Sequence, residues 1–325
     1  MKIIQFIKEW TLIIAILAGI AGYFVYAGIP ALDFSHHAVH EAVSVIQPCL
    51  IFAMLFLTFC KIEPSAMKLK KWHVWILVIQ ATFFVGLGVI LILVPESDMR
   101  VLIEGAMLCL ICPTATAGAV ITRKLGGDVN NITTYTVLIN IVTAMLIPAM
   151  VPFVHPHPGL DVVHSALLIL GKVFPLLLLP FFVAMAVKRF FPDFIKLIDR
   201  VPDLSFYLWA VSLTLAIAVT CHSIMTTEID LATELWLVGI SLVCCVLQFW
   251  LGRKIGMRYG DKVTAGQSFG QKNTVLAIWM GYTIFTPITA VVGGFYSIWH
   301  NVINSYQLYR HDKSERDMAP IKKFY

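Results

Sequence analysis

Long apolar runs recur along the whole chain, and only Glu104, Lys172 and Lys272 place a charge inside them. The runs cover residues 10–32, 42–60, 73–95, 101–122, 129–160, 162–187, 204–227, 235–252 and 263–309. A membrane-spanning helix needs about 20 mainly apolar residues, so each run is long enough to cross a bilayer. The last run is long enough for two spans joined by a turn near Thr286 and Pro287. The pattern therefore predicts ten membrane helices.

The composition excludes a soluble enzyme. Of the 325 residues, 59% are hydrophobic and 13% are charged, and the mean hydropathy is +0.83. Soluble domains average about 45–50% apolar and about 25% charged residues. The net charge of +5 is scattered along the chain, which excludes both a disordered protein and a nucleic-acid partner. The predicted partner is the lipid bilayer, and the sequence assigns no oligomeric state.

Lys and Arg residues alternate between loops as the positive-inside rule requires. The chain has 24 of them, and all lie at the two termini or in every second loop, except Arg100, Lys172 and Lys272. The intervening loops carry acids instead, such as Asp161 and Asp230. With ten spans, this distribution predicts a multi-pass protein of the inner or plasma membrane. Both of its termini would lie in the cytoplasm.

Ten helices divide into two sets of five, and an odd number per half gives the second half an inverted topology. We expect an all-α fold of two inverted five-helix repeats, at residues 1–155 and 156–309, and a mobile cytoplasmic tail at 310–325. Helix-breaking residues interrupt the fourth span at 112–118 and the ninth at 266–273. Backbone that is unwound at membrane depth must be satisfied by protein, water or ligand. The two breaks therefore mark the candidate binding site.

At these breaks the sequence resembles the bile acid:sodium symporter family. The matching stretches are Cys112-Pro113-x-x-Thr116-Ala117, Gly127-Asp128-Val129 and Gly270-x-x-Asn273. The resemblance implies a panel bundle of spans 1, 2, 6 and 7, which moves against a core bundle of spans 3–5 and 8–10. In the core, the broken fourth and ninth spans would cross. It also implies alternating-access transport of a small organic anion, such as a bile acid, a keto acid or a pantothenate-like acid.

The residues that bind sodium in that family are largely replaced here. Gly118, Ala119 and Ile132 stand where the family carries polar side chains. Ser268 and Lys272 stand where its second motif has glutamate and glutamine. Hard cations need several oxygen ligands that converge on one cavity. We therefore expect the sodium sites to be degraded. This favours sodium-independent transport, while the sequence leaves both sodium and protons open as the coupling ion. We expect no cofactor.

Lys272 is a charge placed deep in the membrane. It lies ten residues after Lys262, about 15 Å along a helix, near the middle of a hydrocarbon core about 30 Å thick. A lysine there costs about 2.5–3.5 kcal/mol on insertion scales, so it marks a functional site. Our hypothesis is that its ammonium takes the place of the bound sodium ion and also attracts an anionic substrate. Because burial disfavours the charged form of an amine, loss of its proton would couple transport to protons.

A structural role for Lys272 is the alternative, either in an ion pair or with the amine extended to the interface. Glu104 is a poor partner for such a pair, because it lies nine residues before Pro113, about 13 Å along the helix. We expect Glu104 at the membrane interface. Lys172, in the sixth span, is also expected to extend outward.

Other polar residues could join Lys272 at the site. The residues at the breaks either contact a ligand or satisfy the broken-helix backbone. A polar face of the tenth span, which includes Asn304 and Ser305, favours interhelical hydrogen bonds, with a proton relay through its histidine as the alternative. The candidate substrate- or ion-binding residues are Gln80, Thr114, Thr116, Thr136, Ser268, Gln271, Lys272, Asn273, His300 and Asn301.

Two other functional classes compete with a transporter. A membrane-embedded enzyme or redox protein would use Cys109 and Cys112, although such cysteines are more typical of small apolar residues in a membrane helix. A channel would show no saturable, counter-transportable flux. The sequence contains no catalytic constellation and no phosphate-binding loop, so we expect no enzyme activity, and we expect no metal site.

Overall fold

The chain folds almost entirely into helices, as the apolar runs predict. The computed structural model describes residues 2–95, 99–201, 204–227 and 230–318. Within these ranges, the β-structure consists of one isolated bridge between Thr114 and Lys272. The expected all-α fold is therefore confirmed.

The helices follow the predicted spans in order, with short helices in the connections. Their bounds are α1 (Lys2–Ala27), η1 (Pro30–Ser35), α2 (His36–Cys60), η2 (Pro64–Ala66), α3 (Lys71–Leu93), α4 (Arg100–Ile111), α5 (Gly118–Lys124), α6 (Val129–Val154), α7 (Val162–Leu177), α8 (Leu179–Phe190), α9 (Pro192–Asp199), α10 (Leu204–Thr226), α11 (Leu231–Met257), α12 (Lys262–Gly270), α13 (Thr274–Ile284) and α14 (Thr289–Met318).

Six stretches of the described chain are long and apolar enough to cross a membrane. They are Glu41–Cys60, Lys71–Leu93, Val129–Val154, Val162–Phe190, Leu204–Thr226 and Leu231–Met257. Two further apolar stretches, Ile13–Ala27 and Thr274–Ile284, are shorter. The fourth, ninth and tenth predicted spans are not among these six because of helix length or hydropathy. The breaks divide the fourth and ninth spans, and polar residues along α14 lower the hydropathy of the tenth.

Both predicted breaks are present. The first separates α4 from α5, and the second, at residues 271–273, is narrower than expected because α12 continues to Gly270. The predicted turn near Thr286 and Pro287 separates α13 from α14. The sixth span has a division that the sequence analysis does not anticipate, since α7 ends at Leu177 and α8 begins at Leu179. Prolines on both sides explain it, because proline removes a backbone donor and clashes with the preceding turn.

The first part of the expected C-terminal tail, which begins at Arg310, is helical, since α14 continues to Met318. Residues 319–325 of the expected tail lie outside the described ranges.

Aspartates cap the first turns of two helices at the acidic loops. Asp161 accepts a hydrogen bond from the N–H of His164 at 2.7 Å, before α7. Asp230 accepts one from the hydroxyl of Thr233 at 2.5 Å, before α11. The backbone N–H of His164 and the hydroxyl of Thr233 lower the pKa of the two carboxyl groups below the ordinary value for aspartate.

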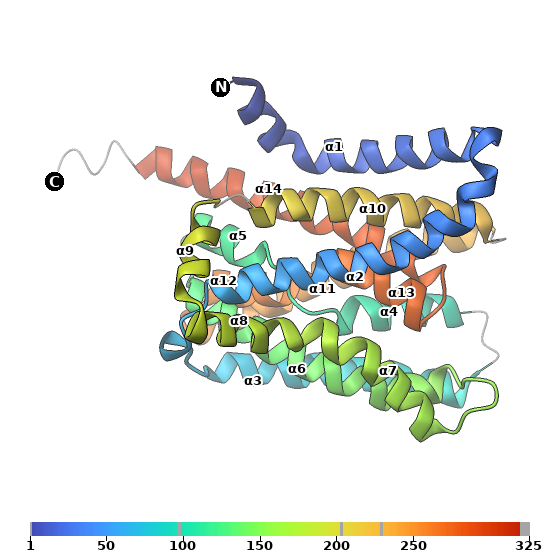
Figure 1. The fold of residues 1–325 in the computed structure, drawn as a ribbon. Helices are drawn as coiled ribbons and strands as arrows, with labels where there is room; N and C mark the ends of the chain where they lie inside the picture. Colours follow the sequence, from blue (N-terminus) through green and yellow to red (C-terminus); the bar gives the residue numbers. More distant parts are fainter. Residues whose placement is uncertain (1, 96–98, 202–203, 228–229, 319–325) are drawn as a thin grey trace.

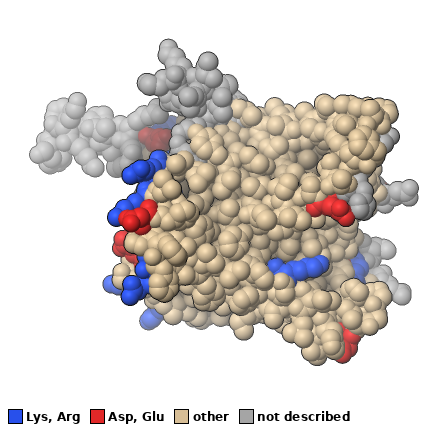
Figure 2. Space-filling view, viewed as in Figure 1, with Lys and Arg blue, Asp and Glu red and all other residues tan. Residues whose placement is uncertain are grey.

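Most of the long helices run side by side, and the start of α1 and the end of α14 lie at the same end of the molecule as α9 (Figure 1). Lys and Arg gather at this end, whereas the flank along the helices is nearly free of charge (Figure 2). Large apolar side chains are exposed on the outer surface, such as Trp236, Phe182 and Leu168. This surface fits a lipid environment.

The close contact between α11 and α12 depends on glycine. A Cβ atom on Gly252 would lie 2.5 Å from the carbonyl oxygen of Ala265, whereas a Cβ atom on Gly239, also in α11, would have no neighbour within 4 Å. We expect Gly252→Ala to lower the free energy of unfolding by about 1–3 kcal/mol through overpacking. Thermal unfolding of the purified protein in detergent measures it.

Gly239→Ala is the matched control for this prediction. It should leave stability unchanged or raise it by up to about 1 kcal/mol, because alanine is a better helix former than glycine. Equal unfolding temperatures for the two variants would contradict the packing of α12 against α11.

Candidate functional site

The two helix breaks pair with each other through their backbones. Thr114 and Lys272 form the antiparallel bridge. The N–H of Ala115 donates to the carbonyl of Gln271 at 2.8 Å, and the N–H of Asn273 donates to the carbonyl of Pro113 at 2.9 Å. Each unwound segment supplies partners that the other has lost, which removes the cost of unpaired backbone at membrane depth.

The last carbonyls of α4 are capped by side chains from other elements. The pairs are Gln248 Nε2 with Cys109 O at 3.3 Å, Lys272 Nζ with Leu110 O at 3.3 Å, Thr143 Oγ1 with Ile111 O at 2.9 Å, and Gln80 Nε2 with Ile111 O at 3.3 Å. The C-terminal end of a helix carries partial negative charge, which favours a cation. The amine of Lys272 is the cationic member of this set.

The Lys272 side chain is enclosed by protein. Its relative exposure is 1%, and its amine lies 5.1 Å from the centroid of the Phe269 ring. The nearby titratable groups are the thiols of Cys109, Cys112, Cys244 and Cys245, and all are free cysteines. The ion pairs found in the described part of the chain do not include Lys272. The amine thus faces carbonyls, a ring and thiols rather than a carboxylate or the surface.

The last carbonyls of α12 are capped in a similar way from the other side. The hydroxyl of Thr114 donates to the carbonyl of Ser268 at 2.6 Å, and the hydroxyl of Tyr296 donates to the carbonyl of Gly270 at 2.7 Å. Asn273 caps the start of α13 by accepting a bond from the N–H three residues later, at 3.2 Å. The thiol of Cys112 donates to the carbonyl of Asn273 at 3.0 Å. Thr114 and Asn273 therefore satisfy the broken-helix backbone.

The other candidate residues differ in the hydrogen bonds that their side chains make. Gln271 and Ser268 each have a buried side-chain oxygen without a hydrogen-bond partner among the described residues, Oε1 and Oγ respectively. Thr116 is half-buried. Thr136 donates to the carbonyl of Ile132 in its own helix at 2.9 Å. Its hydroxyl therefore does not bond to the crossing, by which we mean the paired segments 112–118 and 271–273.

The polar face of the tenth span is only partly brought to the site. Asn304 accepts a bond from Gln267 of α12 at 3.1 Å, which is an interhelical contact of the expected kind. Asn301 donates to a carbonyl of its own helix at 2.7 Å, and Ser305 is exposed. His300 is buried with its Nδ1 unpartnered among the described residues, and its ring meets that of Tyr296 edge-on at 5.8 Å.

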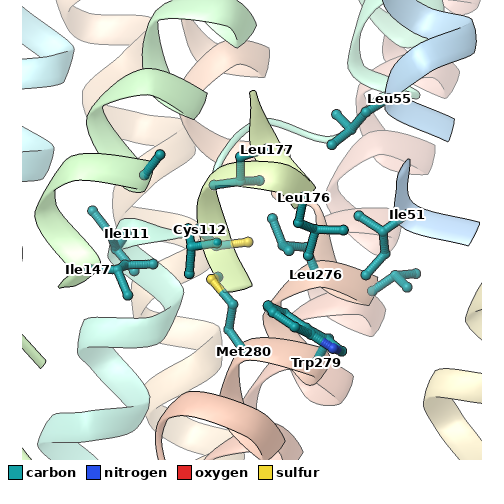
Figure 3. Packing of buried hydrophobic residues seen from close by; sticks show 14 of the residues in the cluster. Ile51, Leu55, Ile111, Cys112, Ile147, Leu176, Leu177, Leu276, Trp279 and Met280 are labelled. Carbon is teal, nitrogen blue, oxygen red and sulfur yellow. The ribbon is translucent and has the colours of Figure 1, made fainter. Parts of the chain in front are cut away.

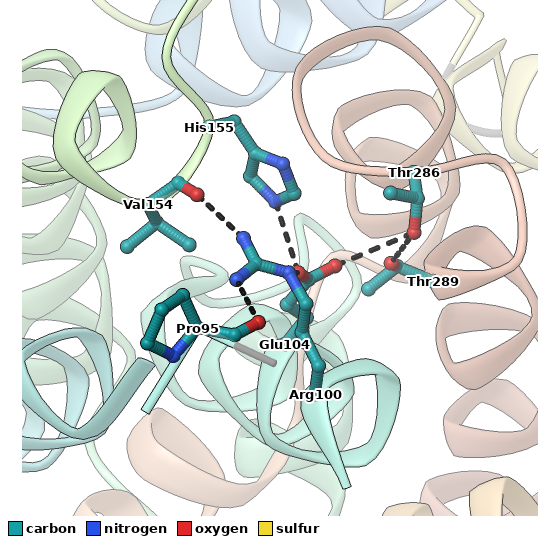
Figure 4. A network of polar contacts seen from close by, with 7 residues as sticks. All are labelled: Pro95, Arg100, Glu104, Val154, His155, Thr286 and Thr289. Atoms are coloured by element: carbon teal, nitrogen blue, oxygen red, sulfur yellow. Dashed lines mark hydrogen bonds and ion pairs between the residues drawn. The ribbon is translucent and has the colours of Figure 1, made fainter. Parts of the chain in front are cut away.

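Glu104 centres a polar network at the other end of α4 (Figure 4). Its Oε1 lies 2.9 Å from Arg100 Nε and 3.2 Å from His155 Nε2, and the hydroxyl of Thr286 donates to its Oε2 at 3.4 Å. Glu104 is expected at the membrane interface. These groups bury its side chain within the protein, at 1% exposure, and its depth in the membrane stays a prediction. The spacing of Arg100 and Glu104 by four residues was visible in the sequence, but the contacts from distant segments were not.

A buried apolar cluster packs beside the crossing (Figure 3). It joins Ile51 of α2 and Leu176 of α7 to Ile111 at the end of α4 and to Leu276 and Trp279 of α13. Helices α2 and α10 of the expected panel thus contact α13, one half of the broken ninth span.

A cavity of about 960 Å³ lies between α1, α2, α7, α10 and α13. None of the candidate residues chosen from the sequence lines it, whereas Lys172 does. Lys172 is exposed, in keeping with the expectation that it extends outward, and it also lines this cavity. The signal in the sequence was a single charge in an apolar run, but its direction depends on how α7 packs.

The comparison with protein families settles the class of protein. Residues 11–300 match the model of the SBF-like CPA transporter family. The chain belongs to this family. It is therefore a membrane transporter, and the resemblance seen at Cys112-Pro113 and Gly270 is confirmed. No individual curated protein matches the chain.

The bond from Thr114 to the end of α12 gives a testable prediction. Thr114→Val keeps the shape of the side chain but leaves the carbonyl of Ser268 without its donor. We expect the free energy of unfolding to fall by about 1–3 kcal/mol, the cost of a buried unpaired polar group. Thermal unfolding in detergent measures the change.

Thr133→Val is the control for this variant. The hydroxyl of Thr133 bonds to the carbonyl of Val129 in its own helix, at 2.7 Å. That carbonyl already belongs to the helix ladder, so the change should stay within about 0.5 kcal/mol. A Thr114→Val protein as stable as this control would refute the role of Thr114.

Proposed function

We propose that this protein is a secondary active transporter of a small organic anion, with Lys272 in place of a bound sodium ion. The observation that carries the proposal is the position of the Lys272 amine, 3.3 Å from the carbonyl of Leu110 at the end of α4. A half-helix end that carries partial negative charge is where a mobile cation would bind. A lysine fixed there supplies the charge without an ion from solution.

Two features of the breaks support the absence of a bound sodium ion. A Cβ atom on Gly118 would lie 3.2 Å from Cδ1 of Ile132 and 3.3 Å from Cγ2 of Thr114, so methyl groups fill the space where an oxygen ligand would have to be. A sodium ion about 4 Å from the ammonium would be repelled by about 4 kcal/mol at an effective dielectric constant of about 20. Transport is therefore sodium-independent in this proposal, and the amine of Lys272 is the group that would carry a proton.

The proposed architecture is that of ten spans in two inverted repeats of five. It is supported by a break in the fourth span and a second in the ninth, and by the pairing of the two through their backbones. The basic end of the molecule holds the start of α1 and the end of α14 (Figures 1 and 2). In this proposal the basic end faces the cytoplasm, as the positive-inside rule favours, with both termini on that side of an inner or plasma membrane.

Alternating access would move the panel helices against the broken helices. The cavity supports this, since α1, α2, α7 and α10 line one part of it and α13 lines another. Its volume is in the range of small-molecule sites. Substrate bound in this space would be released when the two bundles separate on the other side.

Uptake into vesicles tests the proposal. Purified protein in proteoliposomes would be offered radiolabelled cholate, α-ketoisovalerate and pantothenate, one compound for each substrate class. We expect saturable, counter-transportable uptake of at least one, unchanged when choline replaces sodium, because no sodium ion binds. Strict dependence on sodium would defeat the proposal, and uptake that is neither saturable nor counter-transportable would indicate a channel.

Variants at Lys272 test the role of the fixed charge. Lys272→Gln should reduce uptake at least tenfold, because the end of α4 loses its cation, and sodium should not restore it. Lys272→Arg should retain uptake if it folds, as judged by size-exclusion chromatography. Lys254→Gln removes the same charge from an exposed site and should leave uptake unchanged. Normal uptake by Lys272→Gln would overturn the replacement of sodium.

A further inference from the structure

Lys172 is the one charged side chain among the residues that line the cavity. It lies ten residues after the start of α7, about 15 Å into the span. No hydrogen bond or ion pair of Lys172 occurs among the described residues. The Lys172 side chain is exposed, so its amine is open to an incoming ligand, and a charged residue within a membrane span is a candidate functional site.

Gln47 provides a second donor in the same cavity. It lines the cavity from α2, its side chain is 4% exposed, and its Nε2 has no hydrogen-bond partner among the described residues. A buried amide without a partner carries a desolvation cost, which an incoming acceptor would remove. A cationic residue of α7 and a glutamine of α2 whose amide has an unpaired N–H donor thus both line the cavity.

The rest of the lining is mainly apolar and aromatic. Tyr23, Tyr26, Trp279 and Tyr282 line the cavity, and no aspartate or glutamate is among the residues around it. Such walls favour a flat apolar body, since ring faces and edges pack against one another. A neutral or cationic molecule would leave the ammonium unpaired.

We propose that Lys172 and Gln47 bind the carboxylate of an amphipathic aromatic acid, whose ring system packs between the aromatic side chains. The inference rests on the proposed function and deepens it, because it names the substrate class and the residues that select it. The inference also gives the two lysines inside the spans different roles. Lys272 serves the backbone of the crossing, and Lys172 selects the substrate.

Binding of a matched pair of probes tests the inference without requiring transport. Radiolabelled naphthalene-1-acetate, with naphthalene-1-acetamide as competitor, would be measured by equilibrium dialysis on the full chain in phosphatidylcholine nanodiscs. The two compounds differ in charge and share the same ring. We expect the acid to bind at least tenfold more tightly than the amide, because the amide cannot pair with the ammonium.

Variants assign this preference to the two residues. Lys172→Gln should reduce the preference for the acid to less than threefold and leave the affinity for the amide unchanged, whereas Lys172→Arg should keep it. Gln47→Leu should weaken binding of the acid at least threefold. Lys254→Gln is the control for loss of one positive charge outside the cavity and should change neither affinity.

The results that would overturn this binding site differ from those that would overturn the proposed transport function. Absence of saturable binding, or an acid preference that survives Lys172→Gln, overturns the inference even if uptake is observed. A Lys172-dependent preference in a protein that transports no anion supports the site and refutes the transport proposal. Loss of acid binding when phosphatidylglycerol replaces phosphatidylcholine would assign the cavity to a lipid headgroup instead, and we expect no such loss.

Discussion

Backbone polar groups within a membrane must find partners inside the protein, since each unpaired group costs several kcal/mol. The crossing of the two breaks meets this requirement through two reciprocal bonds, from Ala115 to Gln271 and from Asn273 to Pro113. Side chains from surrounding helices cap carbonyls at the ends of α4 and α12. Because each break supplies partners to the other, neither can shift alone without exposing its backbone. The two broken helices are therefore expected to move as one unit.

The two lysines inside the spans are placed very differently. Lys272 is enclosed, and its amine completes the end of α4. Lys172 is exposed and lines a cavity. In the proposed transporter, this separates the charge that stabilises the crossing from the charge that selects an anion. With a fixed cation at the crossing, the site would need no bound sodium ion to be complete.

Much of the fold could be predicted because hydropathy and loop charges report on the membrane directly. The helices α2, α3, α6, α10 and α11 follow the uncharged runs to within six residues at each end, and the breaks follow from proline, glycine and polar residues in mid-span. Side-chain directions could not be predicted in the same way. The burial of Glu104 and the cavity position of Lys172 depend on how each helix is rotated, which long-range packing decides. The division of the sixth span also escaped prediction, because prolines are tolerated in membrane helices.

Diffraction from crystals soaked in thallium, a monovalent cation that scatters anomalously, addresses the crossing most directly. If the amine of Lys272 stands in for a mobile ion, the anomalous map will show no thallium at the crossing. The electron density will place the amine of Lys272 within hydrogen-bond distance of the carbonyl of Leu110. A thallium peak beside residues 112–118 or 271–273, or a Lys272 side chain turned away from α4, would contradict the account.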